Sequence, residues 1–244
     1  FYSTAVPHPL REQLATALAA RCPGPLGRVF FCNSGAEANE NALHLARKAT
    51  GRTAVASVTG GWHGRTVATL ACCDGRSYEA GALRAGMALS ARVAFDDVAS
   101  LDAVLDETMA ALIVEPIQGM AGARDCSPEF LAAARRLCTE RGIVLIFDEV
   151  FVGFRLAAGG AQEYFGVRAD VVTYGKSLAG GLPVGVVCGR KDLMRRFRDD
   201  RPADVCFARG TFNSHPYVMT AMDEFLSRLA SPNFNAIYQG LDET

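Results

Sequence analysis

Ile143-Val144-Leu145-Ile146-Phe147-Asp148 is the stretch that decides the fold of this sequence. Its apolar residues follow one another without alternation, and the run ends at a carboxylate. A strand with one solvated face alternates apolar and polar residues, whereas a continuous apolar run is typical of a strand buried on both faces. We therefore predict a strand over residues 143–147 in the interior of a sheet that helices cover on both sides.

Other short apolar runs extend this reading along the chain. Further strands are predicted at residues 29–32, 53–58, 92–95, 111–114, 171–174 and 184–188. Helical spacing fills several gaps between them, as in Leu10, Leu14 and Leu18, in Ala42, Leu43 and Ala46, and in Phe130, Leu131 and Ala134. Strands alternating with helices predict an α/β fold with a mostly parallel central sheet.

The composition favours an ordinary globular enzyme over several other classes. The chain has 244 residues, 25 basic and 26 acidic, so its formal net charge is −1. Such a balance offers nucleic acid no basic footprint, and no apolar run approaches the roughly 20 residues that span a bilayer. We expect one large domain over residues 1–244 and neither a nucleic-acid nor a membrane partner.

The cysteines and the N-terminus bear on compartment and completeness. Eight cysteines are scattered without a Cys-x-x-Cys pair, which favours buried reduced thiols over a metal site and predicts a cytoplasmic protein. Residues 1–4 lack the features of a signal peptide and an initiator Met. We therefore expect the sequence to begin inside a longer chain.

Ser34-Gly35-Ala36-Glu37 is the first stretch with chemical potential, because it follows a predicted strand and opens a predicted helix. Ser34 with Glu37 three residues later forms a capping-box pattern, which predicts a helix start. Free amides at a helix N-terminus reached through a glycine are also suited to bind a phosphate. Taken alone, the stretch leaves both readings open.

Asp148 and Lys176 each follow a predicted strand, where ligands of open α/β sheets bind. An aspartate there can bind a metal, cap a loop or face a cationic ring nitrogen, and Glu149 beside it is expected to be structural. Gly175-Lys176-Ser177 also matches the end of a P-loop, but that motif needs glycine where Asp170 stands. A P-loop is therefore rejected.

Chemistry connects these three places. A lysine at a buried strand end can form a Schiff base with an aldehyde cofactor. Pyridoxal phosphate requires such a lysine, an acid that keeps its ring nitrogen protonated, and a phosphate-binding loop. Lys176, Asp148 and Ser34-Gly35-Ala36 provide these parts, which predicts pyridoxal 5′-phosphate as the cofactor and no metal.

Six collinear stretches give the sequence a family resemblance. It resembles the class III aminotransferases of pyridoxal-phosphate fold type I, which include acetylornithine and ornithine aminotransferases and glutamate-1-semialdehyde aminomutase. The matching stretches are Phe31-Cys32-Asn33-Ser34-Gly35-Ala36-Glu37-Ala38-Asn39-Glu40, Gly61-Trp62-His63-Gly64-Arg65-Thr66, Glu115-Pro116-Ile117-Gln118-Gly119, Ile146-Phe147-Asp148-Glu149-Val150, Tyr174-Gly175-Lys176 and Arg209-Gly210-Thr211-Phe212-Asn213.

The resemblance implies a role for each matching position. Lys176 forms the Schiff base and Asp148 pairs with the ring nitrogen, while Ser34 and the amides of Gly35 and Ala36 hold the phosphate. The ring is expected between the side chains of Trp62 and Val150. The carboxylate of Glu115 is expected nearby. Gly210 and Thr211 are expected to reach the phosphate bound by the other subunit. The resemblance therefore implies a homodimer with shared sites. His63 either borders the site or is a satisfied core histidine.

Two departures from the family pattern concern the cofactor's ring hydroxyl. Phe151 stands where ornithine-type members have a glutamine, and Met120 stands where the aminomutases have an asparagine. Gln118 is a possible substitute donor.

The implied activity is transfer of an amino group from an amino compound to a keto acid or aldehyde through Lys176. Residues 153–185 are most similar to the aminomutase branch, whereas residues 36–66 are more similar to the acetylornithine branch. An aminomutase and an aminotransferase module of a multidomain synthase are therefore alternatives. Family members also have an N-terminal segment and a small C-terminal domain, which we expect outside residues 1–244.

Overall fold

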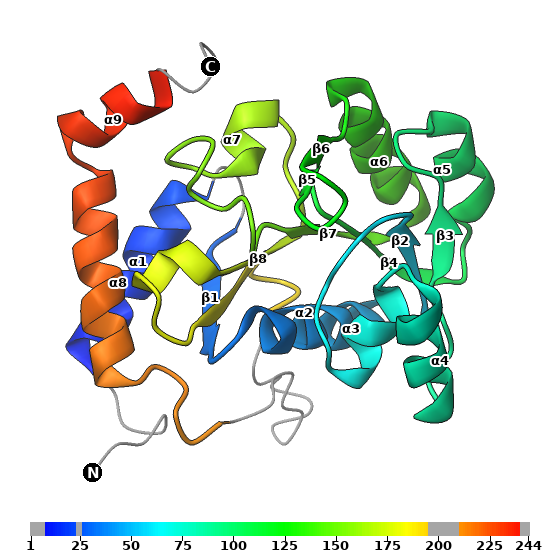
Figure 1. The fold of residues 1–244 in the computed structure, drawn as a ribbon, viewed down its shortest axis with the longest axis horizontal. Coiled ribbons are helices and arrows are strands. Elements are labelled where there is room, and N and C mark those ends of the chain that lie inside the picture. The colour runs from blue at the N-terminus through cyan, green and yellow to red at the C-terminus, as the bar shows by residue number, and fades with distance from the viewer. Residues whose placement is uncertain (1–7, 23–25, 195–209, 240–244) are drawn as a thin grey trace.

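The computed structural model describes residues 8–22, 26–194 and 210–239, and they form a seven-stranded sheet between helices (Figure 1). The strand order is β1-β9-β8-β7-β4-β2-β3. The strands are β1 (Arg28–Cys32), β2 (Ala54–Val58), β3 (Ala91–Val93), β4 (Met109–Val114), β7 (Val144–Asp148), β8 (Val171–Gly175) and β9 (Gly185–Gly189). The predicted strands are all present, and the α/β fold is confirmed.

The sheet is parallel except around β9. Strands β3, β2, β4, β7 and β8 pair in parallel, whereas β9 runs antiparallel to both of its neighbours. Gly185 at the start of β9 therefore lies opposite both Cys32 and Gly175, the last residues of β1 and β8. This register brings the ends of three strands to one edge of the sheet.

Alternate residues of the central strands are buried on opposite faces. In β4, Ala111 and Ile113 pack with helices α2 (Gly35–Thr50) and α3 (Val67–Cys72). Leu112 and Val114 pack on the other face, in the cluster that contains α1 (Pro9–Arg21) and α6 (Pro128–Arg141). Because both faces are covered by helices, the strands need no polar face, and this explains the unbroken apolar runs.

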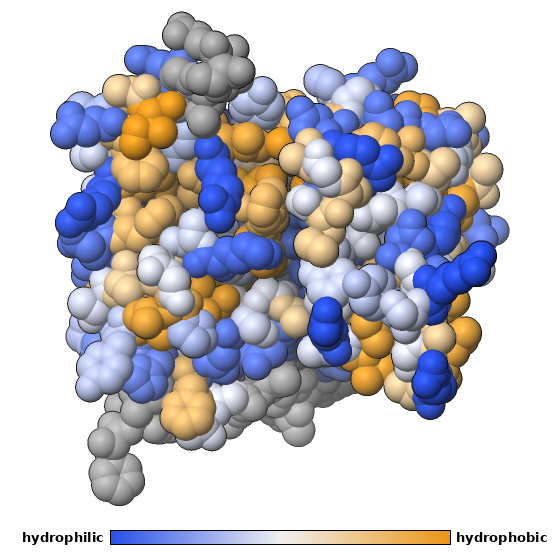
Figure 2. Space-filling view, in the orientation of Figure 1, coloured by the Kyte–Doolittle hydropathy of each residue, from blue (hydrophilic) through white to orange (hydrophobic). Residues whose placement is uncertain are grey.

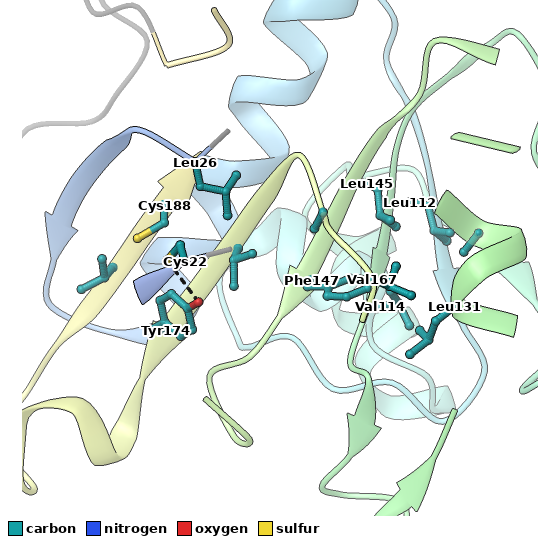
Figure 3. Packing of buried hydrophobic residues seen from close by; sticks show 14 of the residues in the cluster. Cys22, Leu26, Leu112, Val114, Leu131, Leu145, Phe147, Val167, Tyr174 and Cys188 are labelled. Carbon is teal, nitrogen blue, oxygen red and sulfur yellow. Dashed lines mark hydrogen bonds between the residues drawn. The ribbon is translucent and has the colours of Figure 1, made fainter. Parts of the chain in front are cut away.

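The larger cluster contains the bulkiest core side chains (Figure 3). Leu145 and Phe147 of β7 are fully buried. Tyr174 of β8 is also buried, and its hydroxyl lies 3.4 Å from Cys22 Sγ, which gives the phenol a polar partner inside the core. The cysteines among the described residues are all free and buried.

Shorter elements surround this core. The remaining helices are α4 (Arg76–Arg84), α5 (Val98–Val104), α7 (Ala161–Phe165), α8 (Pro216–Leu229) and α9 (Pro232–Gln239), with a 3₁₀ turn η1 at Lys176–Ala179 and a small hairpin of β5 (Ile117–Gln118) and β6 (Arg124–Asp125). Hydrophilic and hydrophobic side chains are interspersed over the face shown in Figure 2. Within the described ranges, no helix has the length and apolar character needed to cross a membrane.

Candidate active site

A cavity of about 510 Å³ lies at the carboxyl ends of the parallel strands. It falls within the range of small-molecule sites. Its lining includes the predicted residues Ser34, Gly35, Ala36, Trp62, Glu115, Asp148, Val150 and Lys176. Segments that are far apart in the sequence thus meet around one cavity, because parallel strands end at the same edge of the sheet.

The N-terminus of α2 forms one end of the cavity. Ser34 is the N-cap, and its Oγ accepts a hydrogen bond from Glu37 N at 3.1 Å. The carboxylate of Glu37 turns back to Asn33 N at 2.8 Å, one residue before the position that a capping box predicts. The amides of Gly35 and Ala36 belong to the first turn, where helix geometry provides no acceptor, so they can bind an anion.

Gly35 also brings this helix end against the strand end of β7. A Cβ at position 35 would lie 2.5 Å from Val150 Cγ1, closer than any real contact. The absence of a side chain therefore lets the amides of α2 and the apolar surface of Val150 share one wall. This spacing suits a ligand with an anionic group at one end and a flat ring at the other.

Asp148 is held in a buried hydrogen-bond network. Its Oδ2 accepts from Asn39 Nδ2 at 2.7 Å and lies 2.8 Å from His63 Nδ1, and its Oδ1 accepts from Val150 N at 3.0 Å. Asn39 is fixed in turn by Thr173, whose hydroxyl donates to Asn39 Oδ1 at 2.6 Å. These contacts hold both oxygens of the Asp148 carboxylate in place.

His63 therefore borders the site and is also a buried histidine. The residue is 2% exposed and lines the cavity, with Nδ1 on Asp148 and Nε2 without a hydrogen-bond partner among the described residues. His63 thus both borders the site and is a buried histidine whose ring contacts Asp148.

Glu115 and Trp62 form another wall. Glu115 Oε1 accepts from Trp62 N at 2.7 Å, and Oε2 accepts from Gly119 N at 3.3 Å. Burial, reinforced by the nearby charge of Asp148, raises the pKa of Glu115 to about 7. The indole of Trp62 packs edge-on against Tyr78 at 4.9 Å between centroids, which fixes its orientation.

Lys176 enters the cavity from the turn after β8. Its backbone is left-handed, with φ of +44°, a conformation that is uncommon outside glycine and that recurs at functional sites. The strand that precedes Lys176 is buried, as expected, but Lys176 itself is exposed. The reason is its position at the start of η1, beyond the buried strand, with Nζ 5.7 Å from the centroid of Phe151.

Comparisons with known proteins agree with this geometry. The family model described as aminotransferase class-III matches residues 1–243. The chain belongs to the class-III aminotransferase family.

Curated relatives in this family have two kinds of activity. The chain is 36% identical over 229 residues to an acetylornithine aminotransferase of Halalkalibacterium halodurans, covering 93% of this chain and 57% of that protein. It is 37% identical over 240 residues to a glutamate-1-semialdehyde 2,1-aminomutase of Pelodictyon phaeoclathratiforme, covering 95% and 55%. The chain thus spans about half the length of the curated relatives that it matches.

Solved structures of transaminases have the same fold. An omega-transaminase from Sphaerobacter thermophilus superposes with a TM-score of 0.84 at 29% identity, covering 96% of this chain and 56% of that chain. A transaminase solved with PLP bound superposes with a TM-score of 0.81, also at 29% identity, covering 95% and 56%. The central sheet is therefore that of fold type I.

The residues present fit the pyridoxal phosphate of class-III aminotransferases. The cavity offers a primary amine, a buried carboxylate held by hydrogen-bond donors, and helix-end amides beside a glycine that has no room for a side chain. This donor set matches an aldehyde, a ring nitrogen and a phosphate respectively.

The two class-III departures lie at the cavity surface. Phe151 and Met120 both line it and are 36% and 69% exposed. Gln118 is not a substitute donor, because it does not line the cavity: its Nε2 donates to Thr59 O at 2.9 Å and its Oε1 accepts from Arg124 at 2.8 Å. Both departures therefore place apolar side chains at the cavity surface.

Gly210 and Thr211 are the predicted residues that do not line the cavity. Their loop reaches its edge through Asn213, whose Oδ1 accepts from Asn33 Nδ2 at 2.8 Å. Thr211 itself is exposed, and Arg209 of the same motif lies outside the described residues. A role of Thr211 toward another subunit stays a prediction.

Sequence reasoning gave Asn39 no role of its own, although it lines the cavity and contacts Asp148. A signal was present: Asn39 lies on the stripe of α2 that also contains Ala42, Leu43 and Ala46. A polar residue on an apolar stripe is expected to be buried and hydrogen-bonded.

Glu149 is structural, as predicted from its position after Asp148. Its oxygens accept from Ala161 N at 2.7 Å and Gln162 N at 3.2 Å, the first amides of α7. It is fully buried, and burial raises its pKa from an ordinary value of 4.5 to about 8. Desolvation of the charged form thus outweighs the two amide donors.

The raised pKa of Glu149 predicts that stability falls as pH rises. The folded protein retains this proton while the unfolded chain loses it above about pH 4.5, so the stabilisation is present at low pH and is lost as pH approaches 8. The shift from 4.5 to about 8 corresponds to about 5 kcal/mol of unfolding free energy. Urea unfolding between pH 5 and pH 8.5 measures this slope.

Glu149→Gln is the control for this prediction. The variant should be less stable at pH 5, because one amide of α7 loses a good acceptor, and it should have a shallower dependence on pH. The same slope in Glu149→Gln and the parent protein would assign the effect to another group.

Proposed function

We propose that this chain is the cofactor-binding large domain of a pyridoxal-phosphate-dependent aminotransferase. The observation that carries the proposal is the convergence of Lys176, Asp148 and the α2 amides on one cavity. Each is a group that the cofactor requires, and each comes from a different strand end. Relatives with amino-transferring activity support the same function.

The residues have distinct tasks in this proposal. Pyridoxal phosphate, when bound, supplies an aldehyde that reacts with amines and a protonated ring that withdraws electrons from the amine-bearing carbon. Asp148 keeps the proton on the ring nitrogen, and the donors from Asn39 and His63 hold its carboxylate in place. The amides of Gly35 and Ala36, with Ser34, bind the phosphate.

Lys176 is proposed as both the attachment point and the proton carrier. With the cofactor bound, its Nζ would accept the proton from the amine-bearing carbon of the substrate and hold it for delivery to the cofactor side, and it would work in the opposite direction for the second substrate. Trp62 and Val150 both line the cavity, where they would confine the ring and exclude water. Their apolar surfaces favour a flat aromatic ligand between them.

Dependence on a separate acceptor tests the function. Full-length protein is given an amino donor with and without a keto acid, and the carbonyl product is measured. We expect sustained turnover only when the acceptor is present, because each amino group taken up must leave on a second molecule. The aminomutase relatives make intramolecular transfer the alternative. Sustained isomerisation of one amino-carbonyl substrate without an acceptor would establish that alternative instead.

A homodimer with shared sites is part of the proposal. It is supported by the position of Thr211, which is exposed on a loop that borders the cavity through Asn213. Thr211→Ala is expected to weaken pyridoxal phosphate binding about 10-fold or more, the loss typical of one hydrogen bond to a charged group. Binding is measured by fluorescence titration.

A mixing experiment decides whether Thr211 acts across the dimer. Combined in one dimer, Lys176→Ala and Thr211→Ala subunits leave one site with both residues intact if Thr211 is contributed by the other subunit. Activity of the mixture above the sum of the separate variants is therefore expected. No gain on mixing, or a monomer that binds the cofactor at full strength, contradicts the shared site.

The free, buried cysteines of the described residues support a reducing compartment such as the cytoplasm.

A further inference from the structure

A second cavity, of about 540 Å³, lies at the opposite ends of the strands. Its lining includes Ile143 and Val144 at the start of β7, Asp170 just before β8, and Arg190 just after β9. Since β7 has five residues, roughly 16 Å of strand separate this cavity from the catalytic one. It is therefore a separate place in the fold.

The charge of this cavity is strongly positive. Its lining carries the guanidinium groups of Arg52, Arg135, Arg168 and Arg190, against the single carboxylate of Asp170. These arginines come from separate segments of the fold: the loop before β2, helix α6, the loop before β8 and the end of β9. The whole chain has a net charge of −1, so this concentration of positive charge is local.

The one carboxylate is already saturated. Asp170 Oδ1 accepts from Arg190 at 2.7 Å, and Oδ2 accepts from Arg135 at 2.9 Å and from Leu145 N at 2.9 Å. Asp170 is 5% exposed, so it stabilises the cavity wall instead of offering a free acceptor to the interior. It offsets one of the surrounding positive charges, and Asp192, outside the lining, offsets that of Arg190 through hydrogen bonds of 3.1 and 2.5 Å. The positive charges of the other arginines remain.

The remaining guanidinium groups have donors to spare. Arg52 uses Nη1 on the carbonyls of Met109, Arg141 and Gly142, at 3.0 to 3.2 Å. Capping of the last carbonyls of α6 explains Arg52 structurally, but no such partner accounts for Arg168. In the described part of the chain, the Arg168 side chain contacts no carboxylate and no carbonyl within hydrogen-bond distance. A guanidinium presents five N–H donors, and an oxyanion is the group that matches their geometry.

We propose that this second cavity binds a small oxyanion with several negative charges, of the phosphate or carboxylate class. Arg168 would close over the ligand from the exposed side, and Arg52 and Arg135 would contribute their unused donors. The volume has room for a molecule the size of pyrophosphate or citrate, and such a ligand would neutralise the positive charge that the neighbouring carboxylates leave. This site does not depend on the proposed aminotransferase activity.

Calorimetric titration with sodium pyrophosphate and with citrate tests the proposal at low ionic strength. The full-length protein is first loaded with pyridoxal phosphate and reduced with borohydride, so that the phosphate end of the catalytic cavity is filled. Saturable binding of at least one probe is expected, and the stronger probe distinguishes phosphate from carboxylate ligands. The loading step reports separately on the proposed function, because protein that fails to load is titrated in the same way.

Arg168→Gln and Arg136→Gln form a matched pair of variants. Both remove one exposed positive charge, but Arg136 pairs with Glu140 on the outer face of α6 and does not line the cavity. Arg168→Gln should weaken binding about 10-fold or more, whereas Arg136→Gln should leave it nearly unchanged. The absence of saturable binding up to millimolar concentrations of either probe, or an equal loss in both variants, overturns the proposal.

Discussion

Replacement of Lys176 by alanine is expected to abolish amino-group transfer without unfolding the protein. Lys176 is the proposed proton carrier, and loss of a positioned general acid–base lowers rates by about 10²–10⁴-fold. Loss of the attachment point adds to this effect, so turnover should fall below detection in an ordinary assay. The fold should tolerate the change because Lys176 is exposed and alanine retains the Cβ.

The measurement combines steady-state kinetics with borohydride labelling. In the parent protein, reduction should fix the cofactor to one lysine, and peptide mapping should place it on Lys176. Lys191→Ala is the matched control, since Lys191 is also exposed but does not line the cavity. If peptide mapping places the label on Lys191 or Lys48, or if Lys176→Ala retains turnover, then the assignment of Lys176 is wrong.

Asp148→Asn should have the second largest effect, and it should act on the cofactor before it acts on stability. Truncation of one partner of a buried charge pair costs about 2–5 kcal/mol, which corresponds to roughly 30-fold to several-thousand-fold weaker binding. The substrate carbon would also lose its proton more slowly, because the ring nitrogen would no longer stay protonated. Both pyridoxal phosphate affinity and kcat should therefore fall.

The stability of the cofactor-free protein separates a role of Asp148 in cofactor binding from a structural role. Asparagine keeps one acceptor oxygen, and His63 can change tautomer to accept from the new amide, so the unfolding free energy should change much less than the affinity. Urea unfolding of the cofactor-free protein and fluorescence titration of pyridoxal phosphate give the two quantities. A variant that loses stability but binds the cofactor normally would show that Asp148 is only a loop cap.

The strands could be predicted from sequence because burial on both faces leaves a continuous apolar run. The direction of β9 could not, since an antiparallel strand covered on both faces has the same run as a parallel one. Short helices such as α3 (Val67–Cys72) were also missed. Its six residues contain too few turns for a periodic pattern, and the side chain of its N-cap Thr66 makes no capping hydrogen bond.

The candidate site was predictable where chemistry depends on residue type at a strand end, as for Asp148 and Lys176. The exposure of Lys176 was not, because it depends on the turn after β8, in which Lys176 itself is left-handed and begins η1. The support of Asp148 by Asn39 also depends on how α2 packs against β7 and β8, which no local pattern specifies. The orientation of the Gln118 side chain likewise depends on its hydrogen bond with Arg124 on the other strand of the small hairpin.

The pairing of β1 with β9 has a consequence for synthesis on the ribosome. β1 lies at the edge of the sheet, and the strand paired with it is β9, which emerges about 150 residues later; at roughly 5–20 residues per second the delay is about 8–30 s. During that time the polar groups along the β1 backbone lack their sheet partner, which exposes an aggregation-prone edge.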